Sequence, residues 1–385
     1  MTEQVLVIGG GYAGTLAANR LLEHTGVDVT LVNPRGSFVE RIRLHQLVGG
    51  SSPAAVDYAK MLHPRARLVV DTASGIDPAR RRVALAGGAV LGYDYLVYAV
   101  GSTAAADAVP GAAEFAHLIA EYQHAQRLRD RLAGLRPDAQ VCVVGAGLTG
   151  IETAAELAEQ RPAGTVTLIC SAALGPSLSR PARESVGRQL ARLGVRVLDG
   201  STVAEVGDFG VLLDDGRELP SAVTVLTAGF GVPDLAARSG LSTDAIGRLI
   251  TDETLTSVDD DRIVAAGDAA APSGRPLRMS CQAALPLGAQ AANTVAHRIA
   301  GTEPAVLNQA FTAQCISLGR SRGTIQLSHT DDTPRRLYIS GHAAAAVKEL
   351  VCRATVSFIA REARKPGSYV WLRGGKRAAP APVAV

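Results

Sequence analysis

The stretch VLVIGGGYAGTLAANRLLEHTGVDVTLVN, residues 5–33, decides the fold of this chain. Its apolar run Val5–Ile8 predicts a short strand, and glycines follow at positions 9, 11 and 14. Leucine and alanine then recur at helical spacing within Thr15–His24, and Val27–Val32 predicts a second strand. A strand, a glycine turn, a helix and a second strand in this order predict a parallel sheet covered by helices.

Gly9, Gly11 and Gly14 form the pattern G-x-G-x-x-G between that strand and that helix. The first glycine permits a tight turn, the second lets the backbone approach a pyrophosphate, and the third lets the helix pack closely on the strand. The N-terminus of the helix then faces the anion. Glycine turns are common, so a single pattern of this kind is weak support for nucleotide binding.

The same unit occurs again 136 residues later, with strands predicted at Val141–Val144 and Thr165–Ile169 and a helix at Ile151–Gln160. The glycines of this second fingerprint are Gly145, Gly147 and Gly150. A repeat at this distance is too long for a solenoid. Two copies in the same context predict two dinucleotide-binding domains.

The other segments extend this α/β pattern. Leu68–Ala86 predicts a meander between the two copies, and Leu285–Ile299 predicts a long helix. The composition changes after about Glu303, which indicates a small third domain. Further strands are predicted at Tyr93–Val100, Val195–Leu198, Gly210–Leu213, Val223–Leu226, Ile263–Ala266, Ala313–Leu318 and Gly323–Leu327.

Length and composition narrow the class of protein. A chain of 385 residues is too long for one ordinary core. With 47% hydrophobic and 19% charged residues it should fold as a globular protein. The net charge of +3 is too small to argue for a nucleic-acid partner. No apolar run approaches ~18 residues, and Met1–Gln4 leads directly into the first strand, so we expect neither a membrane span nor a signal peptide.

The cysteines point to a reducing, cytoplasmic setting. They are an odd number and stand far apart, without C-x-x-C or the spacing of a metal site. Reduced thiols and no bound metal are therefore expected. The five positions are Cys142, Cys170, Cys281, Cys315 and Cys352.

The second strand of such a unit usually ends in an acid that binds the adenosine ribose. Here the corresponding residues are Asn33 in the first unit and Cys170–Ser171 in the second. Asn33 can still donate and accept hydrogen bonds. The uncharged second position removes the repulsion that would exclude a 2′-phosphate. Arg180 or Arg183 could pair with that phosphate, unless both are merely solvated helix charges.

With these motifs the chain resembles the two-dinucleotide flavoprotein superfamily, which includes glutathione-reductase-like enzymes and type II NADH dehydrogenases. Within it the chain is most similar to the AMID-type (apoptosis-inducing-factor-like) NAD(P)H:quinone oxidoreductases. The likeness covers roughly residues 3 to 330. The segment SLGRSRG, Ser317–Gly323, points to this branch. The superfamily signatures are Val5–Gly14, Tyr93–Ser102, Val141–Leu157, Val166–Ser171 and Val264–Ala269.

The resemblance implies FAD at the first fingerprint and NAD(P)H at the second. We therefore expect an FAD-binding domain of residues 1–110 and 248–303, an NAD(P)-binding domain of residues 111–247, and a C-terminal interface domain and tail of residues 304–385. Asp268 would bind the ribityl hydroxyls, through charge-assisted bonds of about 1.5–3 kcal/mol. Its alternative role is that of a helix N-cap.

The resemblance also implies which residues lie at the flavin. Leu285 and Pro286 would sit beside the ring, with the positive end of their helix toward its N1–C2=O edge. Glu152 would lie near the nicotinamide, although it could instead only complement its helix dipole. Glu152 and Pro286 are thus the expected catalytic residues. Further cofactor contacts are expected from Ala13, Arg35, Ala73, Ala99, Gly101, Ser171 and Gly229.

The loop after the first unit carries Arg41, Arg43 and His45. In this fold such a loop runs along the flavin, so a positive charge from Arg41 could hold the pyrophosphate; a solvated loop is the equal alternative. Disulfide reductases of the superfamily place two cysteines in the region Phe38–Gln46, where this chain has none. Cys281 could lie near the ring, but the sequence shows no partner for it. Electrons should therefore pass from FAD directly to the acceptor.

The predicted activity is hydride transfer from NAD(P)H to FAD, followed by reduction of an acceptor, with a quinone as the leading candidate. One alternative is a reductase of a small iron–sulfur carrier protein. Another is a non-catalytic flavoprotein that senses NAD(P)H.

The C-terminal stretch from Lys348 to Arg377 is basic, with eight Lys or Arg and two acids. Its apolar residues recur at helical spacing and predict a face opposite Arg353, Arg361 and Arg364. Such a helix could contact the inner face of a membrane, or pack in the chain or a homodimer interface. A tail from Ala378 is expected to be mobile. The apolar residues are Leu350, Val351, Ala354, Phe358 and Ile359.

Overall fold

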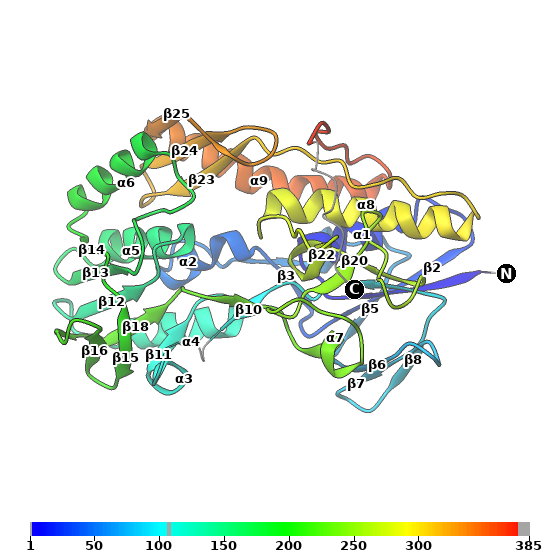
Figure 1. Ribbon diagram of the computed structural model, residues 1–385, viewed down its shortest axis with the longest axis horizontal. Helices are drawn as coiled ribbons and strands as arrows, with labels where there is room; N and C mark the ends of the chain where they lie inside the picture. Colours follow the sequence, from blue (N-terminus) through cyan, green and yellow to red (C-terminus); the bar gives the residue numbers. More distant parts are fainter. Residues whose placement is uncertain (1, 106–108, 376–385) are drawn as a thin grey trace.

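A computed structural model describes residues 2–105 and 109–375, so the tail from Ala378 lies outside the described residues. Two five-stranded parallel sheets form the two ends of the molecule (Figure 1). The first has the order β21 (Ile263–Ala265), β9 (Tyr95–Tyr98), β1 (Glu3–Ile8), β2 (Val27–Asn33) and β5 (Arg67–Val70). The second has the order β11 (Ala116–Leu118), β18 (Val223–Leu226), β12 (Gln140–Val144), β13 (Thr165–Cys170) and β14 (Arg196–Asp199).

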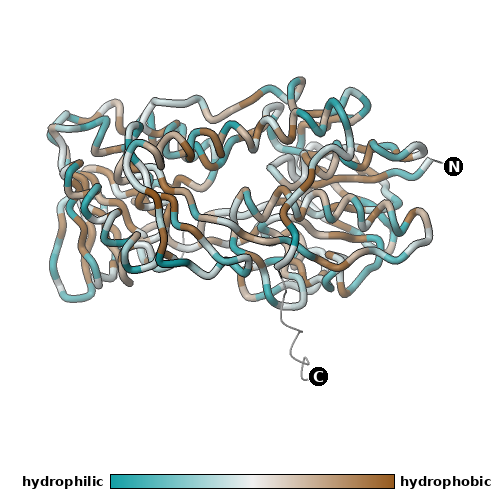
Figure 2. The backbone as a smooth tube through the Cα atoms, turned by 90° about the horizontal axis from the view of Figure 1, so that it is seen from above, coloured by the Kyte–Doolittle hydropathy of each residue, from teal (hydrophilic) through white to brown (hydrophobic). Residues whose placement is uncertain are grey.

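The central strands β9, β12 and β18 are almost entirely buried because helices or a second sheet cover both faces. Figure 2 shows hydrophobic segments running through the interior of both ends, with hydrophilic segments at many of the outer turns. The predicted α/β class with two Rossmann-like sheets is confirmed. Among the described residues, none of the helices combines the length and the apolar composition that a transmembrane helix requires.

Helices α1 (Tyr12–Leu21) and α8 (Cys281–Ile299) pack against each other beside the first sheet. A Cβ atom at Gly288 would collide with the backbone of Ala13, so this glycine allows the close approach. Helix α8 begins four residues before the predicted Leu285, because the Ser280 side chain accepts a hydrogen bond from the Ala283 N–H and caps it there.

Helix α5 (Leu148–Gln160) lies beside the second sheet, together with α4 (Tyr122–Ala133) and α6 (Arg180–Arg192). Both α1 and α5 begin three residues earlier than predicted, because the last residues of each glycine turn already belong to the helix. The shorter helices are α2 (Leu44–Val48), α3 (Ala112–Phe115) and α7 (Leu235–Arg238).

The predicted meander is partly wrong. Its first segment forms β5, which pairs in parallel with β2 through Thr30 and Arg67 and so joins the main sheet. The antiparallel sheet contains β6 (Ala73–Asp77), β7 (Arg82–Leu85) and β8 (Val90–Gly92) instead. The other small strands are β3 (Ser37–Val39), β4 (Ala55–Asp57), β10 (Thr103–Ala104), β15 (Val203–Gly207), β16 (Gly210–Leu213), β17 (Glu218–Pro220), β19 (Phe230–Gly231), β20 (Leu249–Thr251) and β22 (Ala270–Pro272).

The C-terminal part is an antiparallel sheet of β23 (Ala313–Ser317), β24 (Gly323–Ser328) and β25 (Pro334–Gly341), followed by α9 (His342–Arg364). Helix α9 packs against this sheet and α1. The single apolar face predicted for it is wrong, because Ile359 is fully buried while Leu350 is 67% exposed. Arg353 is exposed and pairs with Glu349 one turn away.

Candidate functional site

The first glycine turn has an opening at the N-terminus of α1. Gly9 has φ +100°, and a Cβ atom at Gly14 would collide with the Gly9 carbonyl, so both positions require glycine. A Cβ atom at Gly11 would meet nothing within 4 Å, which marks open space there. Helix α1 has no side-chain cap at Gly11, so its first N–H groups can receive an anion. This arrangement fits a pyrophosphate of FAD.

The second glycine turn repeats this geometry at α5. Gly145 has φ +133°, and a Cβ atom at Gly150 would collide with its carbonyl. Gly147 borders open space, and its helix again has no side-chain cap. Gly229, with φ +76°, follows the neighbouring strand β18 at the same edge of the sheet. The residues present therefore fit the pyrophosphate of NAD(P)H.

The predicted residue Asn33 and the additional residue Tyr58 both hydrogen-bond to Gly10 in the first turn. Asn33 Oδ1 accepts a hydrogen bond from the Gly10 N–H at 3.0 Å, and its Nδ2 donates to the Arg35 carbonyl at 2.7 Å. The Tyr58 hydroxyl donates to the Gly10 carbonyl at 2.6 Å. Asn33 therefore fixes the turn, a role that the sequence did not reveal. The Arg35 side chain donates to Gln123 at 2.8 Å, and burial lowers its pKa.

Three further predicted residues meet where β9 and β21 end. The Ser102 hydroxyl donates to Asp268 Oδ2 at 2.7 Å, and Arg41 Nη1 donates to the Ser102 carbonyl at 2.7 Å. Gly101 lies beside that guanidinium. Asp268 makes no N-cap in the described structure, because Ala266 occupies that position of its short helix. Ser102 thus links the Asp268 carboxylate to the Arg41 guanidinium at this sheet edge.

The remaining predicted FAD contacts are dispersed around the first sheet. Ala13 lies against Gly267, Ala99 lies against Gly9 and Gly14, and Ala73 begins β6 farther away. Leu285 and Pro286 are buried inside α8, past its first turn.

The predicted 2′-phosphate partners are not poised for that role. Ser171 is exposed at the end of β13. Arg180 pairs with Glu184 at 2.9 Å on the surface, and Arg183 donates to the Leu178 carbonyl at 3.3 Å.

Glu152 is the centre of a buried polar cluster. Its Oε1 accepts hydrogen bonds from the Ser317 N–H at 2.9 Å and the Ser317 hydroxyl at 3.0 Å. Lys348 Nζ lies 3.0 Å from the same oxygen, and His45 Nδ1 lies 3.7 Å from Oε2. These four residues come from α5, β23, α9 and α2. Glu152 therefore does more than complement a helix dipole.

In this Glu152 cluster, Glu152 and Lys348 stabilise each other's charged form. Burial opposes ionisation of Glu152, but the charge of Lys348 and the hydrogen bond from Ser317 favour it and leave the pKa of Glu152 below its ordinary value. Burial also opposes the charge of Lys348, yet Glu152 raises the pKa of Lys348 above its ordinary value. Burial lowers the pKa of His45 to about 4, so this imidazole is neutral at physiological pH. A paired carboxylate and ammonium thus face a neutral imidazole.

A cavity of about 490 Å³ borders the Glu152 cluster on its outer side. Lys348 and Ser317 contribute to its wall, so both residues contact the cavity and Glu152. Arg43 also lines it and pairs with Glu349 at 2.9 Å. The side chains of Arg43 and His45 turn to the C-terminal part, where Arg43 donates to Glu349 and His45 contacts Ser317; whether their segment runs along the flavin stays a prediction.

Sequence reasoning missed Lys348 and Ser317 as site residues. Ser317 is the first residue of the segment SLGRSRG, so this motif could have identified it as a site residue. Lys348 was assigned only to a basic helix. No group of three or more His, Cys, Asp or Glu side chains in the described part of the chain could hold a metal ion.

Cys281 of α8 lies near a cysteine of β23 and one of α9, although the sequence shows no partner for it. Cys281, Cys315 and Cys352 lie close enough for their charges to raise one another's pKa, and no disulfide joins them. Burial is the main cause of each increase, and the pKa of Cys352 rises to about 11. Protonated thiols are weak nucleophiles.

Replacing Cys281 by serine should therefore leave turnover within about twofold of wild type, since a protonated thiol carries no part of the reaction. Steady-state turnover and flavin content measured together test this. A loss above about a hundredfold with flavin retained, roughly 2.7 kcal/mol of barrier, would instead indicate a thiol relay.

Comparisons with known proteins agree with this geometry. Residues 3–288 match the family described as pyridine nucleotide-disulphide oxidoreductase. An NADH dehydrogenase-like protein of Mycobacterium tuberculosis is 31% identical over 376 residues, covering 90% of this chain and 92% of that protein. A type II NADH:quinone oxidoreductase of Staphylococcus epidermidis is 25% identical, with 91% and 94% covered. The solved structure of sulfide:quinone oxidoreductase from Aquifex aeolicus has the same fold, with a TM-score of 0.80, 19% identity and 94% and 92% covered.

Proposed function

The chain belongs to the pyridine nucleotide-disulphide oxidoreductase family and is an FAD-dependent NAD(P)H oxidoreductase, and on this premise we propose that its electron acceptor is a quinone. FAD, when bound, supplies the redox chemistry by taking hydride from NAD(P)H and returning two electrons. The protein supplies binding, orientation and protons. The name of the type II NADH:quinone oxidoreductase relative supports this acceptor.

The Glu152 cluster is the observation that carries the proposal. Reducing a quinone to a quinol consumes two electrons and two protons, and hydride brings only one of those protons. The second must come from solvent. Iron–sulfur carriers accept electrons without protons and would need no such cluster. Lys348 contacts both the outer cavity and Glu152, so its ammonium can stabilise the negative charge that develops on a quinone oxygen and pass it a proton, which solvent then replaces. The raised pKa of Lys348 keeps the proton on its ammonium until the acceptor becomes strongly basic.

Short-chain quinones should oxidise the NAD(P)H-reduced protein at roughly tens of molecules per second. The measurement is steady-state turnover with a benzoquinone or naphthoquinone, compared with a ferredoxin, dioxygen and thiols under the same conditions. Faster turnover with ferredoxin would favour the carrier-protein alternative. A rate near zero with every acceptor, and a stable reduced flavin, would favour the sensor.

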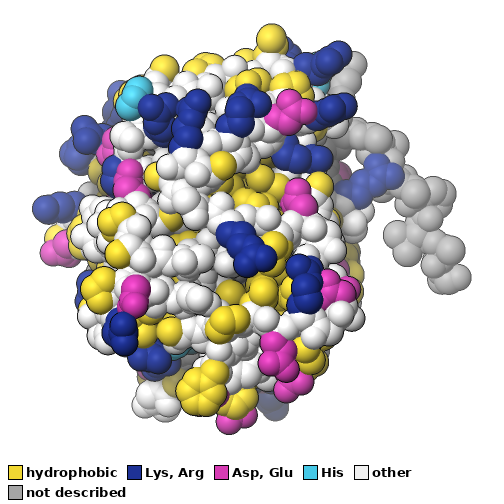
Figure 3. Space-filling view, turned by 90° about the vertical axis from the view of Figure 1, so that its left-hand side faces the viewer, with side chains coloured by type: hydrophobic (Ala, Val, Ile, Leu, Met, Phe, Trp, Pro, Cys, Tyr) yellow, Lys and Arg dark blue, Asp and Glu magenta, His cyan; other side chains and the backbone are white. Residues whose placement is uncertain are grey.

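An apolar strip on the C-terminal part suggests where a lipid quinone or a second protomer would approach. The strip consists of residues that are 37–67% exposed on β25 and α9. Figure 3 shows Lys and Arg side chains gathered along the upper edge of the end that contains β25 and α6. β25 contributes exposed Arg335 and Arg336. The strip residues are Leu337, Ile339, Val347, Leu350 and Phe358.

We propose that this strip is a contact surface, either for an anionic membrane on its cytoplasmic side or for a homodimer. Deleting α9 would remove part of the core, so the surface double variant Leu350→Glu/Phe358→Glu is the better probe. Sedimentation with anionic vesicles and molecular mass should be measured at low salt. If the double variant loses the vesicle binding of the wild type, the strip contacts the membrane. If the double variant is a monomer where the wild type is a dimer, the strip lies in the dimer interface. If the wild type binds no vesicles and is a monomer, the strip contacts neither a membrane nor a second protomer.

A further inference from the structure

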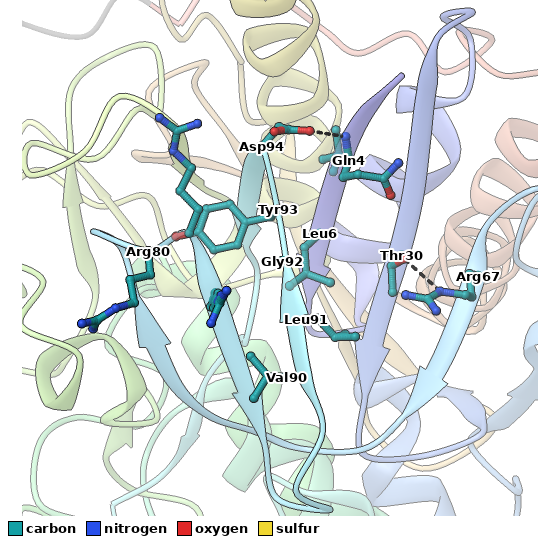
Figure 4. Close-up of a pocket in the computed structure, with 13 residues that line it drawn as sticks. Gln4, Leu6, Thr30, Arg67, Arg80, Val90, Leu91, Gly92, Tyr93 and Asp94 are labelled. Atoms are coloured by element: carbon teal, nitrogen blue, oxygen red, sulfur yellow. Dashed lines mark hydrogen bonds between the residues drawn. The ribbon is translucent and has the colours of Figure 1, made fainter. Parts of the chain in front are cut away.

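A cavity of about 590 Å³ lies between the first parallel sheet and the antiparallel sheet of β6, β7 and β8. Residues of β1, β2 and β5 form one side, and the β7–β8 hairpin forms the other (Figure 4). Gln4 and Arg67, which line it, stand at the amino ends of β1 and β5, whereas the FAD glycine turn follows the carboxyl end of β1. This space, called here the Arg67 cavity, is therefore separate from the redox site.

The wall of the Arg67 cavity is strongly basic. It contains four arginines, Arg67, Arg80, Arg81 and Arg82, against one acid, Asp94. That carboxylate is already engaged, because its Oδ2 accepts a hydrogen bond from the Gln4 N–H at 2.8 Å. A cavity with this surplus of positive charge attracts anions.

The arginines differ in whether an acid neutralises them. Arg80 pairs with Asp77 at 3.0 Å, and Figure 4 shows its guanidinium directed away from Leu6 and Leu91. Within the described residues, neither Arg67 nor Arg82 pairs with a carboxylate within 4.0 Å. Arg67 Nε donates instead to the Thr30 hydroxyl at 3.2 Å, which holds the guanidinium across the edge of the sheet (Figure 4).

The floor between these charges is apolar. Val90 is 57% exposed, and Leu91 of β8 lies beside it between Arg80 and Arg67 in Figure 4, packed against the core that contains the buried Leu6. An inorganic anion would leave this surface uncovered. A ligand that combines a phosphate with a flat, weakly polar group would contact both the floor and the guanidinium groups, whose planar forks match phosphate oxygens.

We propose that the Arg67 cavity binds a nucleoside monophosphate, with the phosphate at Arg67 and Arg82 and the base over Val90 and Leu91. The volume lies within the range of about 300–1,000 Å³ that is usual for small-molecule sites. Binding here requires neither the quinone nor turnover, so its test is independent of the proposed function.

The experiment is calorimetric titration of the FAD-loaded full chain with AMP at low salt, with NADP⁺ present to occupy the coenzyme site. Arg67→Ala and Arg82→Ala should each weaken AMP binding at least tenfold. Arg80→Ala is the matched control, since its charge is already paired, and should change affinity less than twofold. Adenosine, which lacks the phosphate, and inorganic phosphate, which lacks the base, should each bind at least tenfold more weakly than AMP.

The proposal is overturned if AMP produces no saturable heat, or if binding is unchanged in both Arg67→Ala and Arg82→Ala. It is equally overturned if NADP⁺ displaces AMP, because the ligand then occupies the coenzyme site, or if inorganic phosphate binds as tightly as AMP. Binding of phosphatidic acid vesicles through Arg67 without AMP binding would assign the site to a lipid headgroup instead. Thermal unfolding midpoints equal to wild type are required of each variant, and Arg67→Gln replaces Arg67→Ala if the latter is unstable.

Discussion

Gly11→Val should give a folded but colourless protein, with FAD content reduced at least a hundredfold. Gly11 has φ −79°, which any residue can adopt, and its Cβ would meet no protein atom within 4 Å. The fold should therefore tolerate valine. The added side chain would fill the open space at the N-terminus of α1, where the pyrophosphate must approach the backbone. Absorbance of the bound flavin after gel filtration measures the loss of FAD, and the thermal unfolding midpoint measures whether the variant is folded.

Gly147→Val is the matched control at the second fingerprint. Gly147 has φ −73° and also borders open space. This variant should stay yellow and lose reduction of its flavin by NAD(P)H, whereas a chemical reductant should still bleach it. Loss of FAD from Gly147→Val with retention in Gly11→Val would reverse the assignment of the two sites. Full NAD(P)H-dependent activity in both variants would show that neither glycine turn has to approach a pyrophosphate.

The two glycine turns could be predicted because part of what determines them is local. Cβ atoms at Gly14 and Gly150 would collide with the carbonyls of Gly9 and Gly145 in the same strand–turn–helix unit, so the spacing of these glycines carries the information. Cβ atoms at Gly9 and Gly145 would collide with Ala99 and Thr227, which lie far away in the sequence. The start of α8 was missed by four residues, since leucine periodicity marks buried positions and not the Ser280 cap. Strand β25 was missed because both of its faces are largely exposed and its sequence has no buried run.

The Glu152 cluster could not be assembled from the sequence, because its four residues lie on separate elements. Lys348 is 196 positions from Glu152, and the tertiary packing of α9 on β23 brings them together. One signal was nevertheless available. The chain contains four lysines among its 39 basic residues, so Lys348 departs from a strong preference for arginine. Lysine can release its proton in a protein, whereas arginine effectively cannot.

Glu152→Gln and Lys348→Gln should each lower quinone reduction at least a hundredfold, equivalent to about 2.7 kcal/mol of barrier, because each removes one member of the proton-holding pair. Each single variant also leaves a buried charge without its partner, which typically costs about 3–5 kcal/mol of stability. A low rate in either single variant could therefore reflect damage to the fold. Steady-state turnover and denaturant unfolding must be measured on the same preparations.

The double variant Glu152→Gln/Lys348→Gln separates the two explanations. Removing both charges leaves two amides that can hydrogen-bond to each other and to Ser317, so most of the lost stability should return. Activity should not return, because neither amide can exchange a proton at neutral pH. Flavin reduction by NAD(P)H, followed in a single turnover without quinone, should stay within about tenfold of wild type, since hydride transfer draws no proton from this pair. If the stable double variant reduces quinone at the wild-type rate, the pair is only structural, and the acceptor must obtain its proton elsewhere.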